Sequence, residues 1–214
     1  METIMKIIET GGLPTIIIFV LAFILIFITI ERVLALYIRY SSIRSGSLEE
    51  NTKDLIINQN YPDALQLCNK DSSSPSSKII KNGLLAAENG REAMKSALSG
   101  SILDISHKCE IRLNYIGLIA NVSTLLGLLG TITGLIKTFQ YLSADVTDPT
   151  EKQQLLGSGI SEAMYSTATG LVVGVAAMVI HSVLTSKSDN IVAKAQDLGL
   201  KFITWMEQSE RSPV

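Results

Sequence analysis

The sequence has 214 residues, of which 47% are hydrophobic and 18% are charged, and its formal net charge is −2. This balance does not favour nucleic-acid binding, which is typical of basic chains. The 2 cysteines and 2 histidines form no cluster suited to a metal, so we expect neither a metal nor another cofactor. The charge is also unevenly spread, and three long stretches carry none, which argues against a soluble enzyme.

The three uncharged stretches are long enough to cross a membrane. They cover residues 10–30, 116–136 and 163–186, with His181 counted as neutral. A helix needs about 20 predominantly apolar residues to cross the hydrocarbon core of a bilayer, so each stretch predicts one transmembrane helix. A cleaved signal peptide is the alternative for the first stretch, but residues 1–9 carry more acidic than basic side chains, which disfavours it.

Basic residues near the ends of these stretches predict the orientation of the helices, because such residues are held on the cytoplasmic side of a membrane. One side of the predicted spans carries Arg39, Arg44, Lys53, Lys108, Arg112, Lys187, Lys194 and Lys201. The other side has Lys6 and Lys152 among Asp145, Asp148 and Glu151. We therefore expect the N-terminus outside and the C-terminus inside. Cys68 and Cys109 would then face a reducing compartment, where a disulfide is disfavoured.

The expected fold is an all-α membrane protein with long cytoplasmic helical extensions. Its expected parts are an outer N-terminus with the first span (1–38), a cytoplasmic helical domain (39–113), the second span (114–142), an outer loop (143–158), the third span (159–186) and a cytoplasmic C-terminal helix (187–214). Residues 91–142 contain no proline and repeat apolar residues at helical spacing, which predicts one continuous helix. Turns are expected around Pro62, Pro75 and Gly90.

The C-terminal helix is expected to continue the third span. Its apolar stripe consists of Ile191, Ala195, Leu198, Phe202 and Trp205. The first span is built from bulky apolar residues, which is typical of a helix that faces lipid. It ends in Glu31 and Arg32, and we expect these at the inner membrane interface with the arginine stem extended toward water.

The second and third spans each carry a stripe of small and hydroxyl residues. The stripe of the second span is Ala120, Thr124, Gly127, Thr131, Gly134 and Thr138. That of the third is Ala163, Thr167, Gly170, Gly174, Ala177 and His181. Small residues at this spacing, such as the pairs Gly130/Gly134 and Gly170/Gly174, let membrane helices pack closely. Hydroxyls in alternate layers can instead line a narrow pore, although bonds to their own backbone can make them inert, and both interpretations remain open.

Few ionisable side chains lie near the spans, where they are costly and usually functional. Glu162 and Lys137 are expected at similar depth near the outer surface, and a structural ion pair and a functional role are both open. His181 lies near the cytoplasmic end, where a packed neutral imidazole is the favoured interpretation. No Asp or Glu lies at mid-membrane depth on either stripe. If the chain moves protons, another chain must therefore supply the central carboxylate.

Several local sequences together resemble the MotA/TolQ/ExbB proton-channel family. Residues 125–131 read LLGLLGT, residues 159–163 read GISEA after an acidic loop, and residues 166–171 read STATGL. Glu31 and Arg32 resemble the Glu-Arg signature of that family. Three spans with a modest cytoplasmic domain resemble its ExbB/TolQ branch.

The resemblance implies a non-enzymatic homopentamer in the bacterial inner membrane. Its pore would enclose single-span ExbD/TolR-like partners whose aspartate carries the proton. Proton flow would then energise a TonB- or TolA-like protein in an envelope process such as outer-membrane import.

The resemblance also assigns residues. Thr131 and Thr167 match the pore-facing threonines, and Glu162 matches the acidic residue of the outer third helix. Thr124 and Thr138 share the stripe of Thr131 and are expected on the same path. The glycines expected to pack the helices are Gly127, Gly130, Gly134, Gly170 and Gly174. Thr124 and Ala176 stand where the family often has proline, which leaves the bend of both helices open.

Two other functions are alternatives to a proton channel. A non-conducting membrane scaffold would pack through the same glycines, and partner-dependent proton uptake separates it from a channel. An intramembrane hydrolase would use Ser158 with His181, but at 1.5 Å per residue these positions lie about 34 Å apart along a helix, which excludes contact between them.

Overall fold

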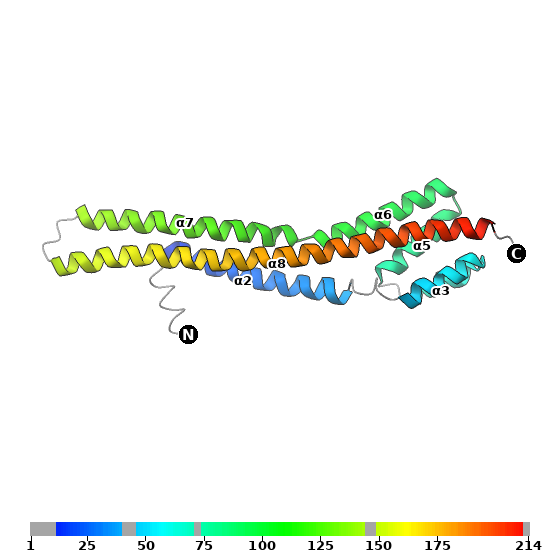
Figure 1. Ribbon diagram of the computed structural model, residues 1–214, viewed down its shortest axis with the longest axis horizontal. Coiled ribbons are helices and arrows are strands. Elements are labelled where there is room, and N and C mark those ends of the chain that lie inside the picture. The colour runs from blue at the N-terminus through cyan, green and yellow to red at the C-terminus, as the bar shows by residue number, and fades with distance from the viewer. Residues whose placement is uncertain (1–11, 40–45, 71–73, 144–148, 212–214) are drawn as a thin grey trace. The chain divides into compact units, whose positions relative to one another are not determined.

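The computed structural model describes residues 12–39, 46–70, 74–143 and 149–211, and the elements found there are helical (Figure 1). In chain order they are α2 (Gly12–Leu34), the π-helical turn η1 (Ala35–Arg39), α3 (Gly46–Ile57), α4 (Tyr61–Lys70), α5 (Pro75–Ala87), α6 (Arg91–Glu110), α7 (Leu113–Ser143) and α8 (Pro149–Arg211). The all-α prediction is confirmed. The orientation signals expected at Lys6, Arg44, Asp145 and Asp148 lie outside the described residues.

Within the described part of the chain, three helical segments are long and apolar enough to cross a membrane. The first is Gly12–Tyr37, the second includes α7, and the third is α8. The prediction of three spans is therefore confirmed, and the chain is a multi-pass membrane protein.

The chain divides into two compact units, which are described separately. The spanning unit comprises Met1–Ile30 and Arg112–Val183, and the extension unit comprises Glu31–Ile111 and Leu184–Val214. The expected limits at residues 38, 113, 142, 158 and 186 concern position in a membrane and stay predictions.

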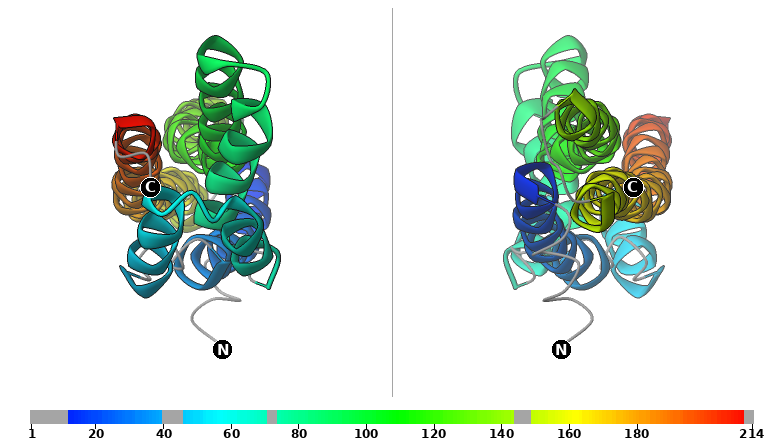
Figure 2. Two further views of the ribbon diagram at one scale, coloured as in Figure 1. Left: turned by 90° about the vertical axis from the view of Figure 1, so that its right-hand side faces the viewer. Right: turned by 90° about the vertical axis from the view of Figure 1, so that its left-hand side faces the viewer.

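The helices of the spanning unit, α2, α7 and the first part of α8, lie side by side, as the end-on views in Figure 2 show. Over most of its length α2 turns bulky side chains outward, and Phe23 and Phe27 are among the most exposed apolar residues of the chain. Exposed apolar side chains are stable where lipid is the solvent, and α2 already satisfies its backbone polar groups within the helix. The inward side of α2 includes Ile18 and Leu25, which are buried.

The predicted continuous helix over residues 91–142 is wrong at one point, because α6 ends at Glu110 and α7 begins at Leu113. Ile111 is extended (φ −51°, ψ 131°) and Arg112 has a φ of 68°. A positive φ is costly for a residue other than glycine. No proline or glycine marks this break, so the sequence pattern could not show it.

The longest helix, α8, has 63 residues and joins the predicted third span to the predicted C-terminal helix without a break. The expected continuation is confirmed. The predicted C-terminal stripe is also confirmed, because Ile191, Ala195, Leu198, Phe202 and Trp205 are all buried. The helix begins at Pro149, so residues 149–158, expected in a loop, are helical. Proline suits the first helical position because it needs no hydrogen-bond donor there, and Glu151 favours the positive end of the helix dipole.

In the extension unit, α5 and α6 form a hairpin whose turn is at the predicted position, with Gly90 at a φ of 100°. The core contains Ile79, Ile80 and Leu98 together with Phe202 of α8. A Cβ atom at Gly83 would lie 2.7 Å from the ring of Phe202 and 2.9 Å from Leu98. Glycine is therefore required for the close approach of α5 to α8 at this point.

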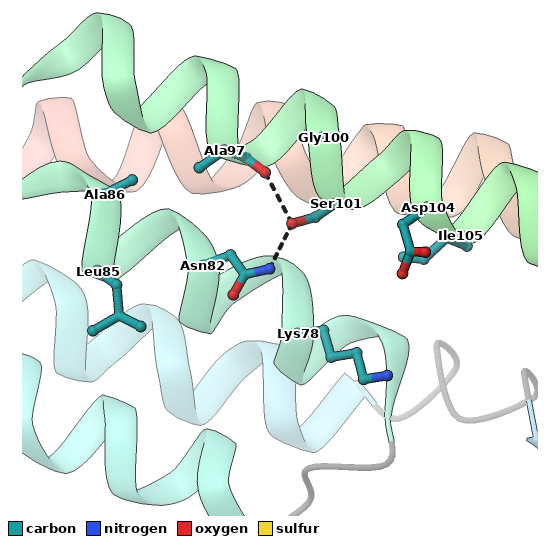
Figure 3. Close-up of a pocket in the computed structure, with 9 residues that line it drawn as sticks. All are labelled: Lys78, Asn82, Leu85, Ala86, Ala97, Gly100, Ser101, Asp104 and Ile105. Carbon is teal, nitrogen blue, oxygen red and sulfur yellow. Dashed lines mark hydrogen bonds between the residues drawn. The ribbon is translucent and has the colours of Figure 1, made fainter.

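A polar link joins the two helices of this hairpin. The side-chain amide of Asn82 donates to the Ser101 hydroxyl at 2.9 Å, and that hydroxyl donates to the carbonyl oxygen of Ala97 at 2.9 Å (Figure 3). The link lies in an open groove of about 560 Å³ between α5 and α6. Lys78 and Asp104 bring charges of opposite sign to this groove.

The Arg32 side chain was expected to extend toward water, but it is buried instead. Its side chain is 7% exposed, and it donates to Glu31 at 2.9 Å and to the carbonyl oxygen of Lys108 at 3.4 Å. Lys108 lies in the last turn of α6, where carbonyl groups lack intrahelical partners. Arg32 therefore places a positive charge at the negative end of α6, which is a stabilising arrangement.

Cys68 and Cys109 are free thiols, and both are buried in the extension unit. Burial raises the pKa of each thiol from 9.0 to about 11, because the charged thiolate loses its hydration. Lys81 opposes this shift at Cys68, and Arg32 opposes it at Cys109. Neither thiol is therefore suited to react as a thiolate at neutral pH.

Candidate functional site

The contact between α7 and α8 is made by glycines whose backbones touch. A Cβ atom at Gly170 would lie 2.6 Å from the carbonyl oxygen of Ser123 and 2.8 Å from the Cα atom of Gly127. A Cβ atom at Gly134 would lie 2.8 Å from the Cβ atom of Ala163. A side chain has no room at these positions, so the two helices approach as closely as their backbones permit.

Residues later in α7 pair with residues earlier in α8, as expected for antiparallel helices. Gly134 meets Ala163, Gly127 meets Gly170, and Thr124 meets Gly174. Toward the other end of α7, a Cβ atom at Gly117 would lie 3.4 Å from the imidazole Nε2 of His181. The contact therefore continues over most of α7 and places the half-buried His181 at its far end.

Each predicted path threonine already donates its hydroxyl to a backbone carbonyl. Thr124 donates to Ala120 at 3.0 Å, Thr138 to Gly134 at 2.9 Å and Thr131 to Leu128 at 2.6 Å. These bonds are local to α7 and are common for hydroxyl side chains in membrane helices.

Thr167 differs from the threonines of α7 because its hydroxyl also reaches another helix. Its proton is shared between the carbonyl oxygen of Gly127 on α7 and that of Ala163 on α8, each at 3.1 Å. Thr131 lies one helical turn after Gly127 on α7, and its side chain is half-buried. No hydrogen bond joins Thr131 to Thr167 among the described residues.

Glu162 and Lys137 form the ion pair that their expected depth suggested. The ammonium of Lys137 donates to both carboxylate oxygens of Glu162, at 2.6 and 2.8 Å. The side chain of Glu162 is 14% exposed, whereas that of Lys137 is 45% exposed. The partly buried carboxylate is therefore neutralised by a cation that reaches it from the surface of the chain.

Two serines at the helix contact were not singled out by the sequence analysis. Ser123 and Ser166 are fully buried in the chain, and their hydroxyls have no hydrogen-bond partner. A Cβ atom at Gly130 would overlap the Ser166 hydroxyl, so Gly130 provides the space that this side chain occupies. Each serine directly precedes a threonine of the predicted stripe, and the stripe did not indicate that the serine also lies at the helix contact.

Among the residues that the structure describes, no group of three or more His, Cys, Asp or Glu side chains could hold a metal ion. The described groups at the α7–α8 contact are hydroxyls, backbone carbonyls, the Lys137–Glu162 ion pair and, at its far end, the imidazole of His181. Such groups can exchange or relay hydrogen bonds within a span.

Comparison with known proteins agrees with this architecture. The MotA/TolQ/ExbB proton channel family matches residues 71–197, more than half of the chain. Over 102 residues the chain is 35% identical to biopolymer transport protein exbB1 of Vibrio cholerae, covering 47% of this chain and 43% of that protein. Over 68 residues it is 46% identical to an ExbB-like protein (ExbB-like 3) of Synechocystis, covering 32% of each. The chain thus spans less than half the length of these relatives.

A solved structure extends the likeness to the fold. A chain of the C. jejuni MotAB structure matches with a TM-score of 0.56 at 15% identity, covering 94% of this chain and 80% of that chain. At this identity the likeness concerns the fold alone. The matched residues 71–197 contain the whole glycine contact between α7 and α8, and with it the Lys137–Glu162 pair and all four predicted path threonines. The chain therefore belongs to the MotA/TolQ/ExbB proton channel family, and the resemblance to the ExbB-like branch is confirmed by the relatives named ExbB.

Proposed function

We propose that this chain is the pore-forming subunit of a proton-driven motor in a bacterial inner membrane. It would act with a single-span partner of the ExbD/TolR kind and energise a TonB- or TolA-like protein. Outer-membrane import is an example of a process that such a motor could serve. The activity proposed is ion transfer coupled to movement and involves no enzymatic reaction.

The observation that carries this proposal is the composition of the α7–α8 pair. Its contact consists of glycine backbones and hydroxyls, and the spans that form it contain no carboxylate at mid-membrane depth. A proton path needs a group that binds and releases protons, and hydroxyls with one ion pair at the outer end do not provide one. A second chain with an aspartate in its own span would complete the path.

Within this proposal, Thr131 and Thr167 lie on the path opposite the partner aspartate. Thr124 and Thr138 follow at seven-residue intervals from Thr131, which returns them to nearly the same face of α7. Glu162 would be the charged group at the outer end of this path. A homopentamer around the partner helices would place the exposed apolar faces of the three spans against neighbouring subunits or lipid.

A membrane scaffold is the second candidate, and one observation favours it. The hydroxyls of Thr124, Thr131, Thr138 and Thr167 all donate to backbone carbonyls, so none is left over as a donor in this state. A scaffold would use these hydroxyls and glycines only to hold helices together. Carbonyl-bonded hydroxyls still have lone pairs that accept a hydrogen bond, so a conducting path through the same threonines would use them as acceptors.

The test is partner-dependent proton uptake. The chain would be co-expressed with the neighbouring ExbD/TolR-like chain, purified and reconstituted in liposomes that contain a pH-sensitive dye. We expect uptake with both chains present and none with either chain alone. Native mass spectrometry of the same sample should give five copies of this chain with two of the partner. A stable monomer or dimer with no bound partner, and no uptake, would favour the scaffold.

A further inference from the structure

The first turn of α2 is buried to a degree unlike the rest of that helix. Leu13 is 70% exposed, but Pro14 is buried and the next side chain, Thr15, is 0% exposed. One turn later Ile18 is also fully buried. The start of α2 is therefore seated on the other helices of the spanning unit, whereas much of its remaining surface faces outward.

The surface on which the first turn of α2 packs, called the seat below, is formed by residues of both α7 and α8. A Cβ atom at Gly12, the first residue of α2, would overlap the carboxylate of Glu162 and lie 3.4 Å from its Cγ atom. A Cβ atom at Gly130 would lie 3.6 Å from the Cβ atom of Pro14, next to the Ser166 hydroxyl. Gly12 also has a φ of 66°, so glycine is required there both for space and for backbone conformation.

The carboxylate of Glu162 is the charged part of this seat, and Lys137 fixes its position. Both carboxylate oxygens accept hydrogen bonds from the Lys137 ammonium, which defines the direction of the carboxylate group. The first turn of a helix carries backbone N–H groups without intrahelical partners and a partial positive charge. A carboxylate against the first residue of α2 is therefore electrostatically favourable, and its remaining charge is balanced by Lys137.

We propose that Lys137 is a positioning residue: by pairing with Glu162 it holds that carboxylate against Gly12 and thereby keeps the first turn of α2 seated on α7 and α8. Glu162 then acts as a fixed charge that joins three helices. If the proposed function holds, Glu162 lies at the outer end of the proton path, and its fixed position would then influence proton conduction. This second effect rests on the proposed function. The seating of α2 does not depend on conduction.

The experiment measures how well the seat protects a thiol. Thr15→Cys places a thiol in the buried first turn, and Leu13→Cys places a reference thiol at an exposed position two residues away. Each is labelled with a maleimide in the purified full-length chain in detergent at neutral pH. Cys68 and Cys109 remain in place, because their burial and raised pKa make them slow to react, and the parent chain gives the blank.

Four second substitutions separate charge from packing. Lys137→Met keeps the length of the side chain and removes its charge, Lys137→Arg keeps the charge and two donors, and Glu162→Gln keeps the shape of the carboxylate. Lys152→Met removes an equal charge from the same helix as Glu162 and serves as the matched control. When Lys137→Met or Glu162→Gln is the second substitution, we expect Thr15→Cys to react about 2- to 5-fold faster, the range expected when an ion pair with a half-exposed cation is lost.

The expected pattern includes rescue. Lys137→Arg and Lys152→Met should leave the protection of the thiol near its original level, and Leu13→Cys should react rapidly in every background. Unchanged protection in Lys137→Met would overturn the proposal, because packing of the alkyl stem alone would then seat α2. Equal loss of protection in Lys137→Arg and Lys137→Met would also overturn it.

Proton uptake by the same variants gives a second readout. With the partner present, we expect reduced uptake for Lys137→Met and retained uptake for Lys137→Arg. Normal uptake by Lys137→Met despite lost protection would overturn the link to conduction. If the unmodified complex shows no uptake at all, the proposed function fails, and thiol protection still decides whether Lys137 seats α2.

Discussion

The hydroxyl of Thr167 on α8 shares its proton between Ala163 of its own helix and the carbonyl oxygen of Gly127 on α7, at 3.1 Å in each case. This bond crosses the helix contact at the layer where Gly127 and Gly170 touch. Thr167 therefore has a structural hydrogen bond and a proposed place on the proton path, and substitutions of this residue test both roles.

Thr167→Val and Thr131→Val should each reduce partner-dependent proton uptake by about tenfold or more, while Thr167→Ser retains most of it. Valine keeps the volume but removes the hydroxyl, and a hydrogen-bonded step worth about 1.4 kcal/mol changes a rate about tenfold. Uptake in liposomes is measured with native mass spectrometry of the same samples as the control for assembly. Normal uptake in both valine variants would remove these threonines from the path.

Gly170→Ala should destabilise the spanning unit by about 1–3 kcal/mol, because the added methyl group would meet backbone atoms that cannot move aside. Gly157→Ala, in the same helix, is the matched control, since a Cβ atom there meets nothing within 4 Å. In that variant stability should stay the same or rise by up to about 1 kcal/mol, owing to the higher helix propensity of alanine. Thermal unfolding in detergent checks both, and equal effects of the two substitutions would contradict the close contact.

Reversal of the Lys137–Glu162 pair should show coupling between the two charges. Lys137→Glu and Glu162→Lys alone place like charges side by side, whereas the double variant restores an ion pair of opposite direction. Because Lys137 is 45% exposed, we expect a modest coupling free energy of about 0.5–1 kcal/mol. A denaturant-unfolding double-mutant cycle measures it. Additive effects of the two substitutions would remove the pair as a source of stability.

The thiols of Cys68 and Cys109 should react with maleimide much more slowly in the folded chain than in the denatured chain. Burial raises both pKa values to about 11, so at neutral pH very little of either thiol is the reactive thiolate. Below that pKa the reaction rate of the folded chain should rise about tenfold for each pH unit, because the thiolate fraction does. Rapid labelling at neutral pH without denaturant would contradict the buried positions of both side chains.

Much of the fold followed from the sequence because the physical signals are strong. Uncharged stretches of membrane-spanning length predicted three spans, and the apolar stripe from Ile191 to Trp205 predicted the helical continuation of α8. The small-residue stripes also placed Gly127 and Gly170 on inward faces. Lys137 and Glu162 were expected at similar depth, with an ion pair as one of two open interpretations, because antiparallel spans bring the end of one helix to the start of the next.

The details that failed are those that periodicity does not determine. The stripe includes Thr124 and Thr167, which do lie at the helix contact, but successive residues of a helix are about 100° apart, so it does not show that Ser123 and Ser166 beside them lie there too. The break after Glu110 is formed by Ile111 and Arg112, and neither is a residue type that marks helix ends. The helical residues 149–158 were missed because proline and acidic residues suit both a loop and a helix start.

The sequence by itself therefore determined that the chain crosses a membrane three times through helices of different composition. The reason is that a helix can cross a bilayer only where a stretch of about 20 residues is uncharged and largely apolar. Only the tertiary structure decided which side chains meet. The seat of α2 joins Gly12, Lys137 and Glu162, which are more than a hundred residues apart at the extremes, through steric fit and ion pairing. Such contacts depend on the rotation and depth of each helix against its neighbours, and these are set by packing.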